Sequence, residues 1–254
     1  MITFNNKVIT INNDWLKYDT TPVDPYNPLG LPPYTIRLKY TDGVTPTFSK
    51  GTGVQVSSSP NVWDLTYENN DWWFILLDHT SLIEVLGANT TGVINMQGML
   101  QNCSSLRSVP LFDTSDATIM EGMFHRCSSL TTVPLFDTSN VNRMGGMFFY
   151  CSHLANVPLF NTSKVNIMRD MLQGCSSLTS VPLFDTSKVT NISGMLYGCW
   201  FVKKGALSLY QQASTQANPP IYYGDTFTDC GKYTTTGLAE LQQIPTSWGG
   251  LKEE

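Results

Sequence analysis

The sequence has few charged side chains and lacks any long apolar run. Only 14% of its 254 residues are Asp, Glu, Lys or Arg, against roughly 25% in an average soluble domain. The net charge of -5 argues against nucleic acid as a partner, because nucleic acid requires a clustered basic face. No run of about 18 apolar residues occurs, so we expect no membrane insertion. The surface is expected to be rich in Ser, Thr, Asn and Gln, which suits uncharged partners.

The signatures of common enzymes and metal sites are missing as well. None of the six cysteines forms a C-x2-C pair, and the three histidines have no HExxH spacing. We therefore predict no catalytic residue, no metal site and no cofactor. The first eleven residues alternate like a strand and contain no basic segment followed by an apolar one, so we expect no signal peptide.

A 24-residue repeat organises the middle of the chain. Its units share a cysteine, a leucine, the motif V-P-L-F, a D-T-S or N-T-S segment and two methionines, with Ile192 replacing the first methionine in the last unit. The cysteines stand 24 residues apart, at Cys103, Cys127, Cys151, Cys175 and Cys199. The register begins upstream at His79, in the cysteine position, and returns at Cys230 after a seven-residue insertion. Such periodicity predicts one supersecondary unit stacked repeatedly.

Within each unit, the spacing predicts one short strand and one short helix. Leu106, Val109 and Leu111 have the spacing L-x-x-L-x-L, which places Val109 and Leu111 on one face of a strand. Residues 117–127 carry apolar side chains at helical spacing. One such unit buries its apolar face only by stacking on its neighbours. We therefore predict an α/β repeat, a solenoid whose strand ladder advances about 4.8 Å per coil.

The segment Cys175–Cys199, CSSLTSVPLFDTSKVTNISGMLYGC, resembles the BspA-type leucine-rich repeats. These repeats occur in surface proteins of Bacteroides-type gut bacteria, of oral bacteria and of their phages. The resemblance covers residues 75–200 strongly and residues 34–74 and 200–248 more loosely. It implies a leucine-rich-repeat-like solenoid that serves adhesion and recognition, without a catalytic residue.

The flanking segments are predicted to cap this solenoid and to attach it to a partner. We expect four parts: an N-terminal hairpin arm and Pro-rich linker (1–33), a small β domain acting as the N-terminal cap (34–74), the solenoid (75–200) and a helical C-terminal cap (201–254). The arm pairs Ile2–Phe4 with Lys7–Ile11, and residues 18–33, with five prolines, are expected to be extended. Helices are expected at 205–214 and 236–243, closed by Trp248.

The columns of cysteine and of Asp or Asn each admit several interpretations. Side chains on successive coils share one direction rather than facing each other, which favours buried free thiols over disulfides or a metal site. The methionines at helical spacing are expected in the core. Stacked carboxylates at Asp113, Asp137 and Asp185 suit calcium. Asn161 fills the same position without charge, however, which favours Asx turns or helix N-caps.

Two surfaces are candidate binding sites. On the predicted helix side, the positions that differ between units carry Tyr, Phe, His and Arg, which are common binding anchors or polar contacts, although surface positions also drift. These residues are His125, Arg126, Arg143, Phe149, Tyr150, Arg169 and Tyr197. Glu121, Gly145 and Ser193 vary as well. On the strand side, outward-pointing Phe112, Phe136, Phe160 and Phe184 would form an apolar strip, unless neighbouring segments cover it.

These observations favour a non-enzymatic binding or structural protein. The leading hypothesis is a phage virion surface component, such as a fibre, decoration or receptor-binding protein, that contacts other virion proteins through the N-terminal arm and a host surface protein or glycan through the repeats. A trimer is possible, as in many fibres, although no heptad stalk occurs. The alternatives are a bacterial cell-surface or extracellular adhesin and, without a supporting motif, a carbohydrate-active enzyme.

Overall fold

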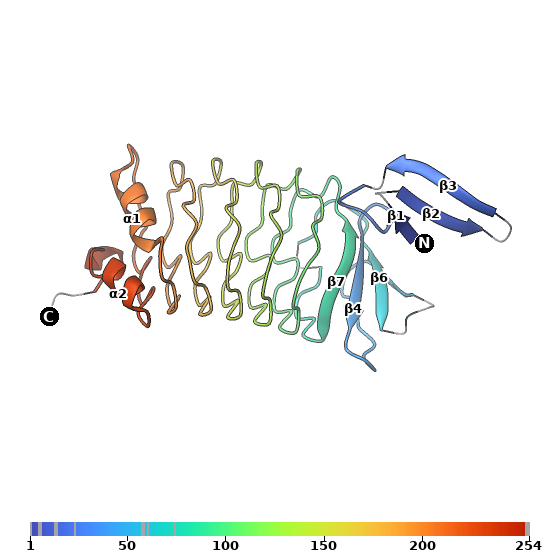
Figure 1. The fold of residues 1–254 in the computed structure, drawn as a ribbon, viewed down its shortest axis with the longest axis horizontal. Coiled ribbons are helices and arrows are strands. Elements are labelled where there is room, and N and C mark those ends of the chain that lie inside the picture. The colour runs from blue at the N-terminus through green and yellow to red at the C-terminus, as the bar shows by residue number, and fades with distance from the viewer. Residues whose placement is uncertain are drawn as a thin grey trace.

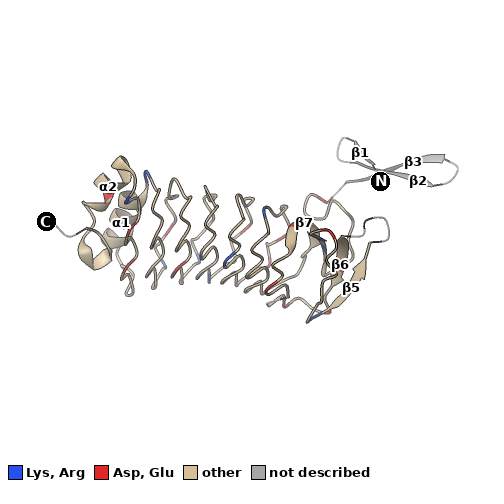
Figure 2. Ribbon diagram, turned by 90° about the horizontal axis from the view of Figure 1, so that it is seen from below, with Lys and Arg blue, Asp and Glu red and all other residues tan. Residues whose placement is uncertain are grey.

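The chain forms a stack of coils with a small β sheet at its N-terminal end and two helices at its C-terminal end (Figure 1). The computed structural model describes residues 2–4, 7–12, 15–22, 24–56, 59, 61–73 and 75–251, the first three ranges as backbone only. Charged residues are scattered along the coils (Figure 2). Among the described residues, no helix combines the length and the apolar character needed to cross a bilayer.

The N-terminal arm is a three-stranded antiparallel sheet rather than a hairpin followed by a linker. Strands β1 (Ile2–Phe4) and β2 (Lys7–Asn12) pair as predicted, and β3 (Trp15–Pro22) pairs with β2. The prediction of an extended linker from residue 18 is therefore wrong. Residues 15–21 contain no proline, so every backbone donor of this segment is free to join a sheet.

A second sheet caps the stack, with strand order β5-β6-β4-β7. Its strands are β4 (Thr35–Tyr40), β5 (Thr52–Gln55), β6 (Val62–Thr66) and β7 (Leu82–Asn89), all paired antiparallel. Three of these strands lie within the predicted small β domain (34–74). Strand β7 belongs by sequence to the first coil, so the sheet extends past the predicted boundary at residue 74 and joins cap and stack.

Each coil hydrogen-bonds to the next through a ladder of single parallel bridges. Their members lie 24 residues apart, from Asn95 through Ile119, Arg143 and Ile167 to Asn191. No strand or helix occurs between β7 and the first C-terminal helix, a range that is fully described. The predicted strand and helix in each coil are therefore both wrong, although the stacking itself is present.

Proline explains the missing strands. The first coil has Leu86 where the following coils have proline, and it forms the eight-residue strand β7. The later coils carry Pro110, Pro134, Pro158 and Pro182 at that position. Proline has no backbone N–H and therefore breaks a ladder in the middle of a sheet.

Left-handed residues explain the missing helices. Gly122 and Arg126 have φ angles of 60° and 59°, which an α-helix does not accommodate. Alternate N–H groups then bond in two ways. Those of Met120, Gly122, Phe124 and Arg126 donate to carbonyls of the next coil at 2.6–3.0 Å, whereas those of Met123, His125 and Cys127 donate three residues back. The apolar periodicity is real, but it belongs to a chain of turns whose donors alternate between its own coil and the next.

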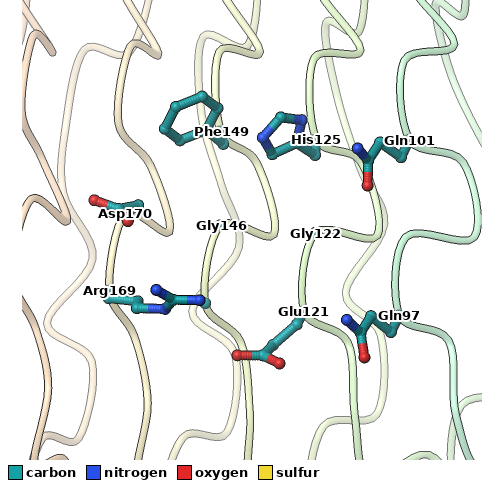
Figure 3. Close-up of a pocket in the computed structure, with 10 residues that line it drawn as sticks. Gln97, Gln101, Glu121, Gly122, His125, Gly146, Phe149, Arg169 and Asp170 are labelled. Atoms are coloured by element: carbon teal, nitrogen blue, oxygen red, sulfur yellow. The ribbon is translucent and has the colours of Figure 1, made fainter.

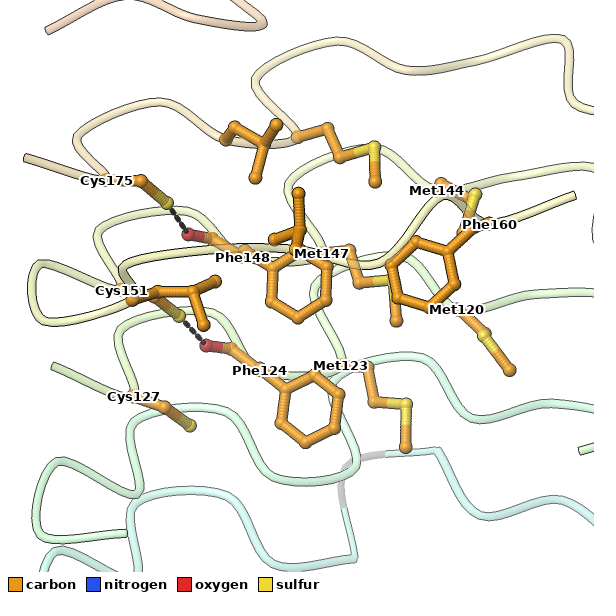
Figure 4. Close-up of a cluster of buried hydrophobic side chains, with 14 of the residues drawn as sticks. Met120, Met123, Phe124, Cys127, Met144, Met147, Phe148, Cys151, Phe160 and Cys175 are labelled. Carbon is orange, nitrogen blue, oxygen red and sulfur yellow. Dashed lines mark hydrogen bonds between the residues drawn. The ribbon is translucent and has the colours of Figure 1, made fainter. Parts of the chain in front are cut away.

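The interior of the stack is made of columns of identical side chains. All six cysteines are free and buried, and the nine methionines from Met96 to Met195 have no exposed surface (Figure 4). The first five thiols each donate to a carbonyl of a preceding coil, with S–O distances of 3.0–3.3 Å. The predicted ladder of buried free thiols is confirmed.

These thiols should make the protein sensitive to alkali. Burial raises the pKa of all six, with Cys127 and Cys175 reaching about 12. Above pH of about 9 the unfolded thiols lose protons that the folded ones keep. The free energy of unfolding should therefore fall with rising pH, by up to about 1.4 kcal/mol per pH unit for each thiol, in pH-dependent urea titrations. Cys127→Ala should lessen this slope; an unchanged slope would contradict the assignment.

The V-P-L-F motif presents its leucine to solvent and its phenylalanine to the core, the reverse of the prediction. Phe112, Phe136, Phe160 and Phe184 are at most 2% exposed, whereas Leu111, Leu135, Leu159 and Leu183 are 37–61% exposed. Two of them stack on phenylalanines of another column: Phe136 lies 6.2 Å from Phe124, and Phe160 lies 6.2 Å from Phe148, between ring centroids. The predicted exposed phenylalanine strip is therefore wrong, and these four residues have no surface to offer a ligand.

The Asp-Thr-Ser segments form Asx turns, one of the predicted alternatives. In each, the serine N–H donates to the side-chain oxygen of the Asp or Asn two residues earlier, at 2.8–3.1 Å. No helix follows, so the N-cap interpretation is wrong. The described residues contain no group of three or more His, Cys, Asp or Glu side chains that could hold a metal ion.

Two helices close the C-terminal end as predicted. They are α1 (Ala206–Thr215) and α2 (Thr235–Leu241), followed by the 3-10 turn η1 (Thr246–Trp248). The carboxylate of Glu240 on α2 accepts from the backbone N–H groups of Gly205 and Leu207 at the start of α1, at 3.2 and 3.1 Å. It thereby serves unpaired donors of that helix end. The buried Trp248 stacks on Tyr223 over the end of the stack.

Candidate binding groove

Four neighbouring coils form a groove of about 350 Å³ on the turn side of the stack (Figure 3). It is lined by Gln97, Gln101, Glu121, Gly122, His125, Gly145, Gly146, Phe149, Arg169 and Asp170. We call it the glycine-floored groove. Its lining residues come from columns repeated every 24 residues, so the coil spacing alone brings them together.

Three glycines form the floor. Gly122 and Gly146 have φ angles of 60° and 59°, a conformation that glycine adopts readily. Gly145 stands in the column between Glu121 and Arg169. A β-carbon there would lie 3.1 Å from Glu121 Oε1 and 3.3 Å from Arg169 Cγ. The side chains of Glu121 and Arg169 therefore lie over Gly145 and occupy the space that a larger residue there would need.

One wall is aromatic and the other is polar. The rings of His125 and Phe149 stack with centroids 4.6 Å apart and planes 8° from parallel. Gln101 continues this wall (Figure 3). Burial lowers the pKa of His125, with Arg126 adding to the effect, so the imidazole is neutral at pH 7 and offers one donor and one acceptor.

The polar wall contains a buried carboxylate that is only half satisfied. Glu121 is 8% exposed, and its Oε2 accepts from Arg143, at 2.7 Å from Nη2 and 3.0 Å from Nε. Its Oε1 is buried and has no partner among the described residues. The Nδ1 atom of His125 across the groove is likewise buried and without a partner there.

Asp170 stands where the other coils have glycine. The equivalent residues are Gly98, Gly122, Gly146 and Gly194. Asp170 nevertheless has a φ angle of 55°, and no hydrogen bond of its carboxylate is found in the described part of the chain. Burial raises its pKa, opposed by the neighbouring charge of Arg169. A strained, half-buried carboxylate without a structural partner is typical of a functional site.

Replacing Asp170 by glycine should therefore stabilise the protein, by about 1 kcal/mol in urea denaturation, because it removes a left-handed non-glycine residue. Asp170→Asn keeps a side chain in that conformation and should recover only part of this gain. A loss of stability in Asp170→Gly would instead assign the carboxylate a role in the fold.

The structure brings together three of the predicted helix-side residues, His125, Phe149 and Arg169, in this groove. Arg143 holds Glu121 from beside it. Arg126 and Tyr150 instead line a second depression. Its other lining residues are Asp78, Thr80, Asn102, Ser104, Ser128 and Ser152. Tyr197 is exposed but lines neither.

The prediction missed Gln97, Gln101 and Asp170 as lining residues. The sequence does contain a signal for Asp170, because it interrupts a glycine column. Gln97 and Gln101 had no such signal, since they belong to the first coil, where the repeat is least regular.

The fold and the groove define a repeat protein. Its core residues recur in each coil, whereas the surface positions that line the groove differ between coils. Residues 78–180 and 131–218 match the model of the family described as Mycoplasma protein of unknown function, DUF285. These matches together span more than half of the 254 residues, and the chain belongs to this family. This agrees with the BspA-like character of its repeats.

Comparison with individual proteins adds one partial likeness. No curated protein matches the chain. Among solved structures, it is similar to a leucine-rich repeat protein from Eubacterium ventriosum ATCC 27560, with 24% sequence identity and a TM-score of 0.32. The similarity covers 40% of this chain and 27% of that protein, so the chain matches about a quarter of that protein's length.

Proposed function

We propose that this chain is a non-enzymatic binding protein, a 24-residue variant of the BspA-type leucine-rich-repeat solenoid, whose turn side recognises a molecule on a host surface. The observation that carries the proposal is the meeting of varied residues and unpartnered buried polar atoms in one groove. Buried polar atoms in folded proteins nearly always have partners. Five exceptions occur among the described residues, and two of them, on Glu121 and His125, lie in this groove, where a ligand from outside would supply the partners.

Chemistry beyond binding has little support in the described part of the chain. Burial raises the pKa of every thiol, so none is an activated nucleophile. The Glu121 carboxylate is paired with Arg143 rather than free to act on a substrate. Incubation of the protein with polysaccharides should release no reducing ends; release would turn the proposal toward a carbohydrate-active enzyme.

We further propose that the protein is displayed on a phage virion. The resemblance to repeats carried by phages supports this, as do the thinly spread charge (Figure 2) and the separate N-terminal sheet, which offers other virion proteins a place to attach. Mass spectrometry and immunogold labelling of purified virions should find the chain on their surface. Its absence from virions would refute this location. We also propose that the protein is a trimer, and its oligomeric state would be measured on the same material.

The alternative is a bacterial cell-surface adhesin. The family description names a cellular bacterium, Mycoplasma, which favours this alternative. The two locations are separated by labelling intact bacteria that carry the gene: an adhesin decorates uninfected cells, whereas a virion protein appears only after phage production.

A further inference from the structure

We infer that the glycine-floored groove binds an uncharged sugar, one or two pyranose rings of a neutral oligosaccharide. The inference rests on the proposed function and names the ligand class of that site. It starts from the two unpartnered atoms, Glu121 Oε1 and His125 Nδ1, which lie in the walls of the same groove. A buried polar atom left without a partner costs about 1–3 kcal/mol, so two in one place point to hydrogen bonds supplied by a ligand.

The charges of the groove cancel in pairs, which favours a neutral ligand. Arg143 holds Glu121 at 2.7 Å, and Arg169 stands beside Asp170 in the chain and acts on its carboxylate. Neither an anion nor a cation would find a site of opposite net charge here. Carboxylates only accept hydrogen bonds and guanidinium only donates them, whereas amides and neutral imidazole do both. Hydroxyl groups are the ligand groups that satisfy all of these at once.

The two walls match the two kinds of surface on a sugar ring. A pyranose carries C–H groups on its faces and hydroxyls around its rim. The stacked rings of His125 and Phe149 supply an apolar wall for the C–H groups. Across the glycine floor, Glu121 and Arg169 supply an acceptor and donors for the rim, and Asp170 supplies a further acceptor at the end of the floor (Figure 3).

The size of the groove limits the ligand to a short segment. Its volume of about 350 Å³ lies at the low end of the roughly 300–1,000 Å³ range of small-molecule pockets. A protein partner would require a far larger contact area than this.

The test uses the full chain, fluorescently labelled, on bacterial cells of candidate host strains. The wild-type protein should label one or more strains. Mild periodate oxidation, which cleaves vicinal diols, should abolish the labelling, whereas treatment of the cells with protease should leave it. The neutral polysaccharide fraction extracted from the same cells should compete, and the acidic fraction should not.

Matched variants connect this labelling to the groove. Phe149→Ala and Asp170→Asn should each weaken binding to the extracted polysaccharide tenfold or more in titration calorimetry. Tyr197→Ala, in the same column as Phe149 but outside the groove, and Asp185→Asn, with the same charge change in an Asx turn, should stay within twofold. Circular dichroism and the urea midpoint verify that every variant is folded.

The possible failures are distinguishable. If the protein labels cells but periodate has no effect, if only the acidic fraction competes, or if the groove variants bind like their controls, the inference is wrong and the proposed function stands. If the protein labels no host strain and binds neither extracted polysaccharide fraction, the proposed function is wrong and the inference is wrong with it.

Discussion

Phe160→Ala is expected to destabilise the protein by about 3–5 kcal/mol, the usual cost of removing a large buried aromatic side chain. Phe160 is 2% exposed and its ring lies 6.2 Å from that of Phe148. Its neighbour Leu159 is 60% exposed, so Leu159→Ala should change the free energy of unfolding by no more than about 0.5 kcal/mol. Urea denaturation of both variants measures the difference.

This pair separates two arrangements of the same motif. A strand with L-x-x-L-x-L spacing would bury the leucine and expose the phenylalanine, and would then give the opposite order of effects. Equal losses from both variants would mean that the motif is buried on both sides. Each coil contacts only its neighbours, so the loss at Phe160 should also lower the stability of the adjoining coils.

Gly237→Ala is expected to cost about 1–3 kcal/mol, the usual penalty for overpacking a tight contact, although alanine in a helix normally gains about 1 kcal/mol over glycine. Gly237 is buried in α2, where a β-carbon would run into the carbonyl oxygen of Val202 and lie 2.7 Å from the Cα of Gly231. Backbone atoms cannot move aside as a flexible side chain does.

The control for this prediction is Thr236→Ala, one residue earlier in α2 and exposed. Alanine there should leave the protein as stable or slightly more so, because only helix propensity changes. Stabilisation by Gly237→Ala in thermal or urea unfolding would show that α2 does not pack on the last coil as closely as described.

The sequence determines the period and the core of this fold more fully than its local structure. Identical residues every 24 positions predicted the stacking and the buried thiols and methionines, whereas both end caps were predicted from the patterns of the flanking segments. The turns within a coil were mistaken for a helix because alternating left-handed residues and an α-helix bury side chains at similar spacing. The predicted strand is absent because a proline in each unit removes the backbone N–H donor that a β-ladder requires. The spacing of apolar residues indicates which side chains share a face. The φ angles determine whether the backbone is a helix or a chain of turns, and here the left-handed φ angles of Gly122 and Arg126 exclude the helix.

The groove was predictable only in part. Comparing the coils with one another singled out His125, Phe149 and Arg169, since varied exposed positions stand out against a constant core. The same comparison selected Arg126, which lines the second depression, and Tyr197, which shares the column of Phe149 but lies two coils further along the stack. Variation reports neither which columns meet in a groove nor where along the stack the groove ends. The phenylalanine strip was wrong because leucine and phenylalanine are both invariant in the V-P-L-F motif, so comparing the coils could not tell which of the two is buried.

The equal length of the coils has a genetic consequence. The joints from Asn95 to Asn191 all use the same single bridge between coils, so gaining or losing one 24-residue unit there leaves the other joints intact. Recombination between the nearly identical stretches of DNA that encode these units would bring different coils next to the coil that contains Gly145. Ligand preference in such a gene would therefore change by shuffling whole modules, while the sulfur-rich interior stays as it is.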